Sequence, residues 1–108
     1  MCAIAGIMTP QPIDPDALTF LARTMADTLI HRGPDSAGTW SNGHVAFAHR
    51  RLSIIDIEEG KQPMHTERGT VITYNGEIYN YLEIRKDLEA AGILFHSQSD
   101  TEVVLRAF

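Results

Sequence analysis

The chain has 108 residues, of which 44% are hydrophobic, and a formal net charge of −5 at pH 7. This length fits one small domain with a packed core, and the acidic balance argues against nucleic acid as the main partner, because no basic stripe could neutralise phosphates. The single cysteine excludes an internal disulfide. No segment approaches the ~20 apolar residues of a membrane helix, so we expect a cytoplasmic protein with no membrane contact.

The first half of the chain is predicted to form a strand, a helix and a hairpin. The apolar run 3–8 has the length and isoleucine content of a buried strand. Apolar residues then repeat at helical spacing across 16–29. A polar loop over 31–38 follows, and the Asn-Gly pair at 42–43 is typical of a hairpin turn before a strand at 44–49.

The second half is predicted to alternate between short strands and two helices. Strand candidates cover 52–57, 70–74 and 93–96. One helix opens at Asn80, and another opens at Ser99 and continues to the last residue without a stop signal. Strands clustered in the middle indicate an α+β fold with antiparallel sheet. Because the last helix has no ending, we expect that the chain is the front part of a longer polypeptide.

Cys2, directly behind the initiator methionine, is the strongest candidate for chemistry. Removal of Met1 would make Cys2 the N-terminal residue, with a nucleophilic thiol and a free α-amine on one residue. The α-amine titrates near pH ~7.7–8, close to the pH at which a general base works best, and it can activate a neighbouring nucleophile. The alternative, suggested by Cys2 alone, is a small buried hydrophobe at the start of a strand.

Four polar motifs accompany Cys2: HRGPD at 31–35, HRRLSIID at 49–56, YNGEIYN at 74–80 and SDTE at 99–102. Each has a structural alternative when taken alone. Asn75-Gly76 is typical of a type I′ turn, Asp100 of a helix cap, and the arginine pair at 50–51 of solvated surface. The histidines have no metal-ligand spacing, so no metal site is predicted; they are His31, His44, His49, His65 and His96.

Together these motifs resemble the N-terminal glutaminase domain of glutamine-dependent asparagine synthetases, which are class II, N-terminal-nucleophile glutamine amidotransferases. The resemblance covers residues 1–108 and includes MCAIAGI, HRGPD, RLSIID, QPM, YNGEIYN and SDTEV in order. It implies a four-layer αββα sandwich with antiparallel sheets, of which this chain supplies only the N-terminal part. The synthetase domain of that family would be absent from these residues.

The resemblance assigns catalytic roles to Cys2, Asn75 and Gly76. Cys2 corresponds to the nucleophile, with its own α-amine as base once Met1 is removed. Asn75 and the backbone N–H of Gly76 correspond to the oxyanion hole, which holds the negative oxygen of the tetrahedral intermediate. Glycine suits that position because the backbone must approach the substrate closely.

The resemblance also implies a binding site for the zwitterionic end of L-glutamine. Arg51 corresponds to the residue that binds the α-carboxylate, a role suited to a bidentate guanidinium. Asp100 and Glu77 correspond to acidic contacts near the α-ammonium. Leu52 and Ile54 correspond to residues whose backbone lines the pocket.

The implied activity is hydrolysis of glutamine to glutamate and ammonia through a γ-glutamyl thioester. The ammonia would feed an ATP-dependent, asparagine synthetase-like amidation, with ATP and Mg²⁺ in the absent synthetase domain and no cofactor in this one. The parent protein is expected to form a homodimer; its ammonia acceptor is aspartate by default, although relatives amidate sugars, peptides or antibiotics. Two alternatives remain: a non-catalytic glutamine-binding or regulatory module, and an inactive fragment that folds only with partner chains.

Overall fold

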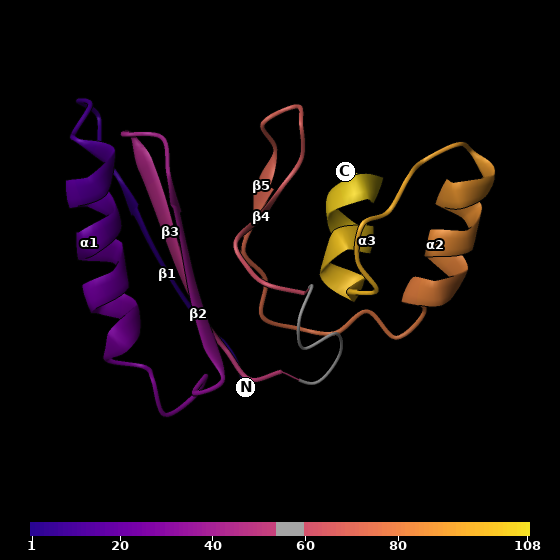
Figure 1. The fold of residues 1–108 in the computed structure, drawn as a ribbon, viewed down its shortest axis with the longest axis horizontal. Helices are drawn as coiled ribbons and strands as arrows, with labels where there is room; N and C mark the ends of the chain where they lie inside the picture. Colours follow the sequence, from indigo (N-terminus) through magenta and orange to yellow (C-terminus); the bar gives the residue numbers. More distant parts are fainter. Residues whose placement is uncertain (54–59) are drawn as a thin grey trace.

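The computed structural model describes residues 1–53 and 60–108. Strands and helices alternate in short segments along the chain (Figure 1). In chain order they are β1 (Ala3–Met8), α1 (Pro15–Asp27), β2 (Ser36–Ser41), β3 (Val45–Arg51), β4 (Met64–His65), β5 (Val71–Ile72), α2 (Tyr81–Ala90) and α3 (Asp100–Ala107).

The first half of the chain forms a three-stranded antiparallel sheet with the order β1-β3-β2. Strands β2 and β3 form the predicted hairpin, with Ser41 opposite Ala46. At the turn, the Asn42 side chain accepts hydrogen bonds from the backbone N–H groups of His44 and Val45 at 3.0 and 2.9 Å. The Asn-Gly pair therefore fixes the register of this hairpin, as the sequence predicted.

Helix α1 covers one face of this sheet and forms the main apolar core. Its buried residues Leu18, Ala22 and Ala26 pack against Ala46 and Ala48 of β3. The small alanine side chains on both elements let the helix lie close to the strands. The helix predicted over 16–29 is present, but it ends two residues earlier, at Asp27. It begins one residue earlier because Asp14 caps it ahead of Pro15, its carboxylate accepting from Ala17 N at 3.1 Å.

The second half of the chain lies on the other side of the sheet. Figure 1 shows α1, the three-stranded sheet, the β4–β5 ribbon and the helices α3 and α2 in that order across the molecule. Strands β4 and β5 are antiparallel, with Met64 opposite Ile72. The fold is therefore α+β with antiparallel sheets, as predicted. Within the described residues no helix is both long enough and apolar enough to cross a membrane.

Three strand predictions in the second half need correction. The strand predicted over 70–74 is confined to β5, and β4 was not predicted. The segment 93–96 is irregular, because the His96 N–H bonds the Glu102 carboxylate at 2.9 Å instead of a neighbouring strand. Strand β3 ends at Arg51, so residues 52–53 do not begin the strand predicted over 52–57, and 54–57 lie outside the described residues.

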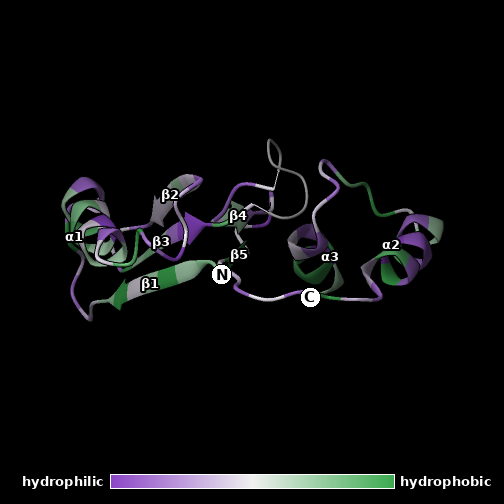
Figure 2. Ribbon diagram, turned by 90° about the horizontal axis from the view of Figure 1, so that it is seen from below, coloured by the Kyte–Doolittle hydropathy of each residue, from purple (hydrophilic) through white to green (hydrophobic). Residues whose placement is uncertain are grey.

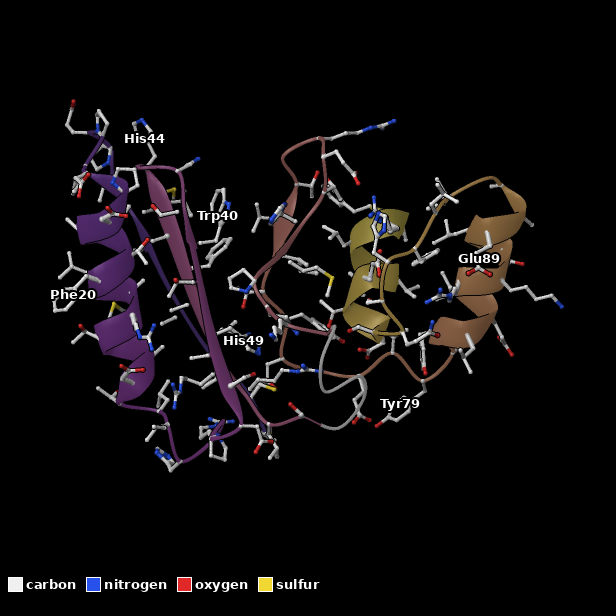
Figure 3. The ribbon with its side chains drawn as sticks, in the orientation of Figure 1. Phe20, Trp40, His44, His49, Tyr79 and Glu89 are labelled. Carbon is white, nitrogen blue, oxygen red and sulfur yellow. The ribbon has the colours of Figure 1, made fainter. Side chains whose placement is uncertain are left out.

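Contacts at His49 and at Gly38 join the sheet to the described part of the second half of the chain. His49 is buried on the sheet face opposite α1, and its Nδ1 lies 2.9 Å from Thr73 Oγ1 (Figure 3). Gly38, opposite His49 in the register, lies against the backbone carbonyl of Gln62. Figure 2 shows that β1, at the edge of the sheet, is largely hydrophobic, and its Met8 is 81% exposed.

The contact at Gly38 generates a stability prediction. A Cβ atom on Gly38 would lie 1.8 Å from the Gln62 carbonyl oxygen, which is rigid backbone. We therefore expect Gly38→Ala to lower the free energy of unfolding by roughly 1–3 kcal/mol through overpacking. Chemical denaturation measures this change.

Gly6→Ala is the matched control for this substitution. Gly6 lies on the same sheet face, but its nearest neighbour would be a Phe47 ring carbon at 3.3 Å, which can shift. Equal stability of the two alanine variants would contradict the close packing of Gly38 against the Gln62 carbonyl.

Candidate active site

A cavity of about 370 Å³ opens where the N-terminus, the end of β3, the segment 74–79 and the start of α3 meet. Figure 3 shows Tyr79, one of its lining residues, near the lower edge of the molecule. Seven of the eight predicted site residues line this cavity: Cys2, Arg51, Leu52, Asn75, Gly76, Glu77 and Asp100. Ile54, the eighth, lies outside the described residues.

The Cys2 thiol is held by the backbone of Leu52. Its Sγ donates to the Leu52 carbonyl oxygen at 3.5 Å, and the Leu52 N–H donates to Sγ at 3.4 Å. The antiparallel pairing of β1 with β3 brings these residues together, because Ala3 lies opposite Arg50. Residues just before β1 therefore meet residues just after β3, although 50 positions separate them in the sequence.

The 31–35 loop fixes the backbone on both sides of Leu52. Gly33 lies against the peptide between Arg50 and Arg51, where a Cβ atom would fall 2.3 Å from the Arg50 carbonyl oxygen. Asp35 donates its backbone N–H to the Arg51 carbonyl oxygen at 2.9 Å, and its carboxylate accepts from the Ser53 N–H at 2.8 Å. The HRGPD motif thus positions the segment that holds the thiol, a role the sequence did not reveal.

The Asn75-Gly76 pair does not form the type I′ turn considered from the sequence. Gly76 lacks the positive φ that such a turn requires, and the pair lies in an irregular segment between β5 and α2. The Tyr74 side chain folds over Gly76, so that a Cβ atom at 76 would lie 2.6 Å from the phenolic oxygen. A side chain at position 76 would therefore displace the Tyr74 ring from the cavity wall.

Acidic side chains gather beside this segment. The Asp100 carboxylate is 7% exposed and accepts from the Ile78 N–H at 2.9 Å, which ties the segment to the start of α3. Burial, followed by the negative charges of Asp100 and Glu77, raises the pKa of Tyr74. Both carboxylates therefore lie close enough to act on the same phenol. Among the described residues that line the cavity, the charged side chains are those of Arg51, Glu77 and Asp100.

The SDTE motif builds the α3 side of the cavity. Ser99 is the N-cap of α3, and its hydroxyl accepts from the Thr101 N–H at 3.2 Å. The Thr101 hydroxyl accepts from the Gln62 side chain at 3.1 Å. Ser99 rather than Asp100 caps the helix, so the Asp100 carboxylate is available for the contacts described above.

Glu102, the last residue of that motif, organises the chain that enters α3. Its carboxylate accepts from the backbone N–H groups of His96 and Ser97 at 2.9 and 2.6 Å, and from the Ser97 hydroxyl at 2.6 Å. Burial opposes ionisation of this carboxyl, but the hydrogen bonds from Ser97, His96 and Arg106 prevail and lower its pKa. An ionised Glu102 therefore holds the turn before Asp100.

The cavity also contains residues that the sequence analysis did not assign to the site. Among these are Gln62, Tyr74, Tyr79, Ser99 and Thr101. The sequence did contain a signal for these residues, because all of them fall within the motifs QPM, YNGEIYN and SDTEV. Within the described residues, no group of three or more His, Cys, Asp or Glu side chains could hold a metal ion.

Comparison with known proteins places these motifs in a family. A family profile described as a glutamine amidotransferase domain matches residues 1–108. The chain is 46% identical over 110 residues to asparagine synthetase (glutamine-hydrolyzing) 1 of Bacillus subtilis strain 168, with all of the chain covered. It is 49% identical over 87 residues to asparagine synthetase (glutamine-hydrolyzing) 3 of that strain, with 78% of the chain covered.

A plant relative shows the same pattern of coverage. The asparagine synthetase (glutamine-hydrolyzing) of Brassica oleracea is 38% identical over 109 residues, and the match covers the whole chain. The chain spans only 17%, 14% and 18% of the length of these three relatives. The similarity therefore concerns one part of each relative.

The buried imidazole of His49 predicts a pH dependence of stability. Burial, and then the charge of Arg51, lower the pKa of His49 from 6.5 to about 4. Between these two values the unfolded chain binds a proton that the folded chain does not, so stability falls as the pH falls from 6.5 to 4. We expect His49 to account for a loss of roughly 3 kcal/mol over this range.

Chemical denaturation of the wild type and of His49→Asn at several pH values isolates this contribution. The difference in unfolding free energy between the two proteins should stay constant above pH 6.5 and shrink below it. A difference that is independent of pH from 7 to 4 would contradict a neutral, buried His49.

Proposed function

Because the chain belongs to the glutamine amidotransferase domain family, we propose that it hydrolyses L-glutamine to glutamate and ammonia. The observation that carries this proposal is the cavity in which the Cys2 thiol meets Asn75, Gly76 and opposite charges. A thiol, a polar side-chain amide and an accessible backbone N–H are the groups that acyl transfer from an amide requires.

The charges of the cavity suit the α-amino acid end of glutamine. Arg51, buried and cationic, would bind the α-carboxylate through two parallel N–H donors. Asp100 and Glu77 would accept hydrogen bonds from the α-ammonium group. A substrate held at this end would extend its side-chain amide toward the Cys2 thiol.

In the proposed reaction, the free α-amine of Cys2 takes the thiol proton as sulfur attacks the amide carbon. The Asn75 side-chain amide and the Gly76 N–H would stabilise the resulting oxyanion. The protonated amine then gives its proton to the leaving nitrogen, and ammonia departs from a γ-glutamyl thioester. Water, deprotonated by the same amine, attacks the thioester and releases glutamate and the thiol.

The backbone of Leu52 supports this role of the thiol. Its N–H donates to Sγ at 3.4 Å and would stabilise the negative charge that develops on sulfur as the proton leaves. Met1 also lines the cavity and is 70% exposed. The proposal requires its removal, because only then does Cys2 carry the free amine.

For the whole polypeptide, we propose an asparagine synthetase-like enzyme. The relatives are named glutamine-hydrolyzing asparagine synthetases, and the chain matches a small part of each. Ammonia from this site would pass to an ATP- and Mg²⁺-dependent synthetase domain that amidates aspartate, in a homodimer. The order of α1, sheet, ribbon and helices supports a four-layer αββα sandwich completed by further residues.

Labelling with 6-diazo-5-oxo-L-norleucine, a glutamine mimic that alkylates catalytic thiols, tests the nucleophile. We expect the intact mass of the natural full-length polypeptide to show loss of Met1 and addition of one label per chain on Cys2. Excess glutamine should prevent labelling, because both molecules occupy the same cavity.

Cys2→Ser is the matched control for the label. It should bind glutamine but take up no label and release no glutamate, since a serine hydroxyl is a far weaker nucleophile than a thiolate. The proposal fails if wild-type protein that has lost Met1 neither takes up the label nor hydrolyses glutamine.

Substitution of Arg51 tests recognition of the α-carboxylate. Lysine keeps the positive charge but loses the two parallel donors of the guanidinium. We expect Arg51→Lys to raise the KM for glutamine about 10- to 100-fold, the range of a lost hydrogen bond to a charged group, with a smaller effect on kcat.

Steady-state kinetics of glutamate release measure both constants. The control is Arg23→Lys, which changes an exposed arginine that pairs with Asp27 in α1, away from the cavity. An unchanged KM in Arg51→Lys would exclude the assigned carboxylate contact.

A further inference from the structure

The side chain of Gln62 joins two walls of the cavity. Its Oε1 accepts from the Tyr74 backbone N–H at 2.6 Å, and its Nε2 donates to Thr101 Oγ1 at 3.1 Å. Tyr74 directly precedes the Asn75-Gly76 pair, and Thr101 directly follows Asp100. Gln62 is 8% exposed, its hydrogen bond to Thr101 is buried, and its hydrogen bond to Tyr74 is partly buried.

The backbone of Gln62 explains why its side chain makes these contacts. In the β4–β5 ribbon, Met64 lies opposite Ile72, and continuing this register would place Gln62 opposite Tyr74. The Gln62 carbonyl, however, packs against Gly38 of β2. The Gln62 side-chain Oε1 therefore accepts the Tyr74 N–H in place of a backbone carbonyl of a neighbouring strand. The Nε2 of the same amide then donates to Thr101.

This arrangement links three parts of the fold at one residue. The backbone of Gln62 is anchored on the three-stranded sheet, one end of its amide holds the segment before Asn75, and the other end holds α3. The planar amide is rigid, so it sets the separation of the two segments that it connects. Thr101 is 2% exposed, so this hydrogen bond to α3 is buried.

We infer that Gln62 is a positioning residue that sets the spacing between the oxyanion donors at Asn75-Gly76 and the ammonium-binding carboxylate of Asp100. The inference rests on the proposed glutaminase function. Glutamine has a fixed length between its side-chain amide and its α-ammonium group, so both ends can be bound correctly only at one spacing. A misplacement of about 1 Å can reduce an enzymatic rate ~10²-fold.

Two substitutions of Thr101 isolate one end of this bridge. Thr101→Ser and Thr101→Ala both remove the methyl group, and only serine keeps the hydroxyl that accepts from Gln62. We expect Thr101→Ala to raise the KM for glutamine about three- to tenfold, the range of one lost neutral hydrogen bond. Thr101→Ser should remain within twofold of the wild type, a difference that mere loss of packing would not produce.

Replacement of Gln62 removes both ends of the bridge. Gln62→Met keeps a side chain of similar length without polar atoms, so we expect kcat to fall about tenfold as well as KM to rise. The double variant Gln62→Met/Thr101→Ala should have the KM of Gln62→Met alone, because the bond lost in the second substitution is already absent.

The measurement is glutamate release by the full-length polypeptide after loss of Met1. Active sites are titrated with 6-diazo-5-oxo-L-norleucine, so that a loss of folded protein does not lower kcat. A purely structural role of Gln62 would leave the kinetic constants per labelled site unchanged and lower only the melting temperature. That result, or equal KM values for Thr101→Ser and Thr101→Ala, would overturn the inference.

The wild type separates this inference from the function on which it rests. If wild-type protein is neither labelled nor active, the glutaminase proposal fails and the positioning role fails with it. If the wild type is active and the variants match it per labelled site, only the role of Gln62 is refuted.

Discussion

The cavity forms where the antiparallel pairing of β1 with β3 brings the N-terminus to the end of β3. This pairing places the residue before β1 beside the residues after β3, so that the Cys2 thiol contacts the backbone of Leu52 and lies in one cavity with Arg51. Helix α1 stabilises this pairing by packing on the alanines of β3. The position of the thiol is therefore a consequence of sheet register rather than of local sequence.

Polar side chains that bond to backbone groups build the remaining walls of the cavity. Asp35 holds the segment after β3, Gln62 holds Tyr74, Asp100 holds Ile78, and Glu102 holds the turn before α3. These backbone groups lie in irregular segments, where side chains rather than a strand ladder supply the hydrogen bonds. Such contacts give irregular chain a defined position, which a binding site made of loops requires.

The predictions from sequence were correct where the deciding contacts are local and wrong where they join distant segments. The helix at Pro15–Asp27 and the hairpin at 42–43 were predictable, because caps, apolar spacing and an Asn-Gly turn act within a few residues. The segments 52–53 and 93–96 have strand-like composition but are irregular. In the first segment, the N–H groups bond the Cys2 sulfur and the Asp35 carboxylate, which are distant in the sequence. In the second, the His96 N–H bonds Glu102, which follows the segment. Composition alone therefore predicted the wrong structure for both segments.

The residue types proposed for the site can be read directly from the sequence. A cysteine behind Met1, an arginine near the end of a strand, an Asn-Gly pair and acidic residues at 77 and 100 were predicted as one set through the resemblance to glutamine amidotransferases. That these six residues share one cavity, and that Gly33, Asp35 and Gln62 position its walls, emerged only from the folded structure. Residue type fixes reactivity and charge, whereas the contacts that position these groups join segments up to 50 residues apart.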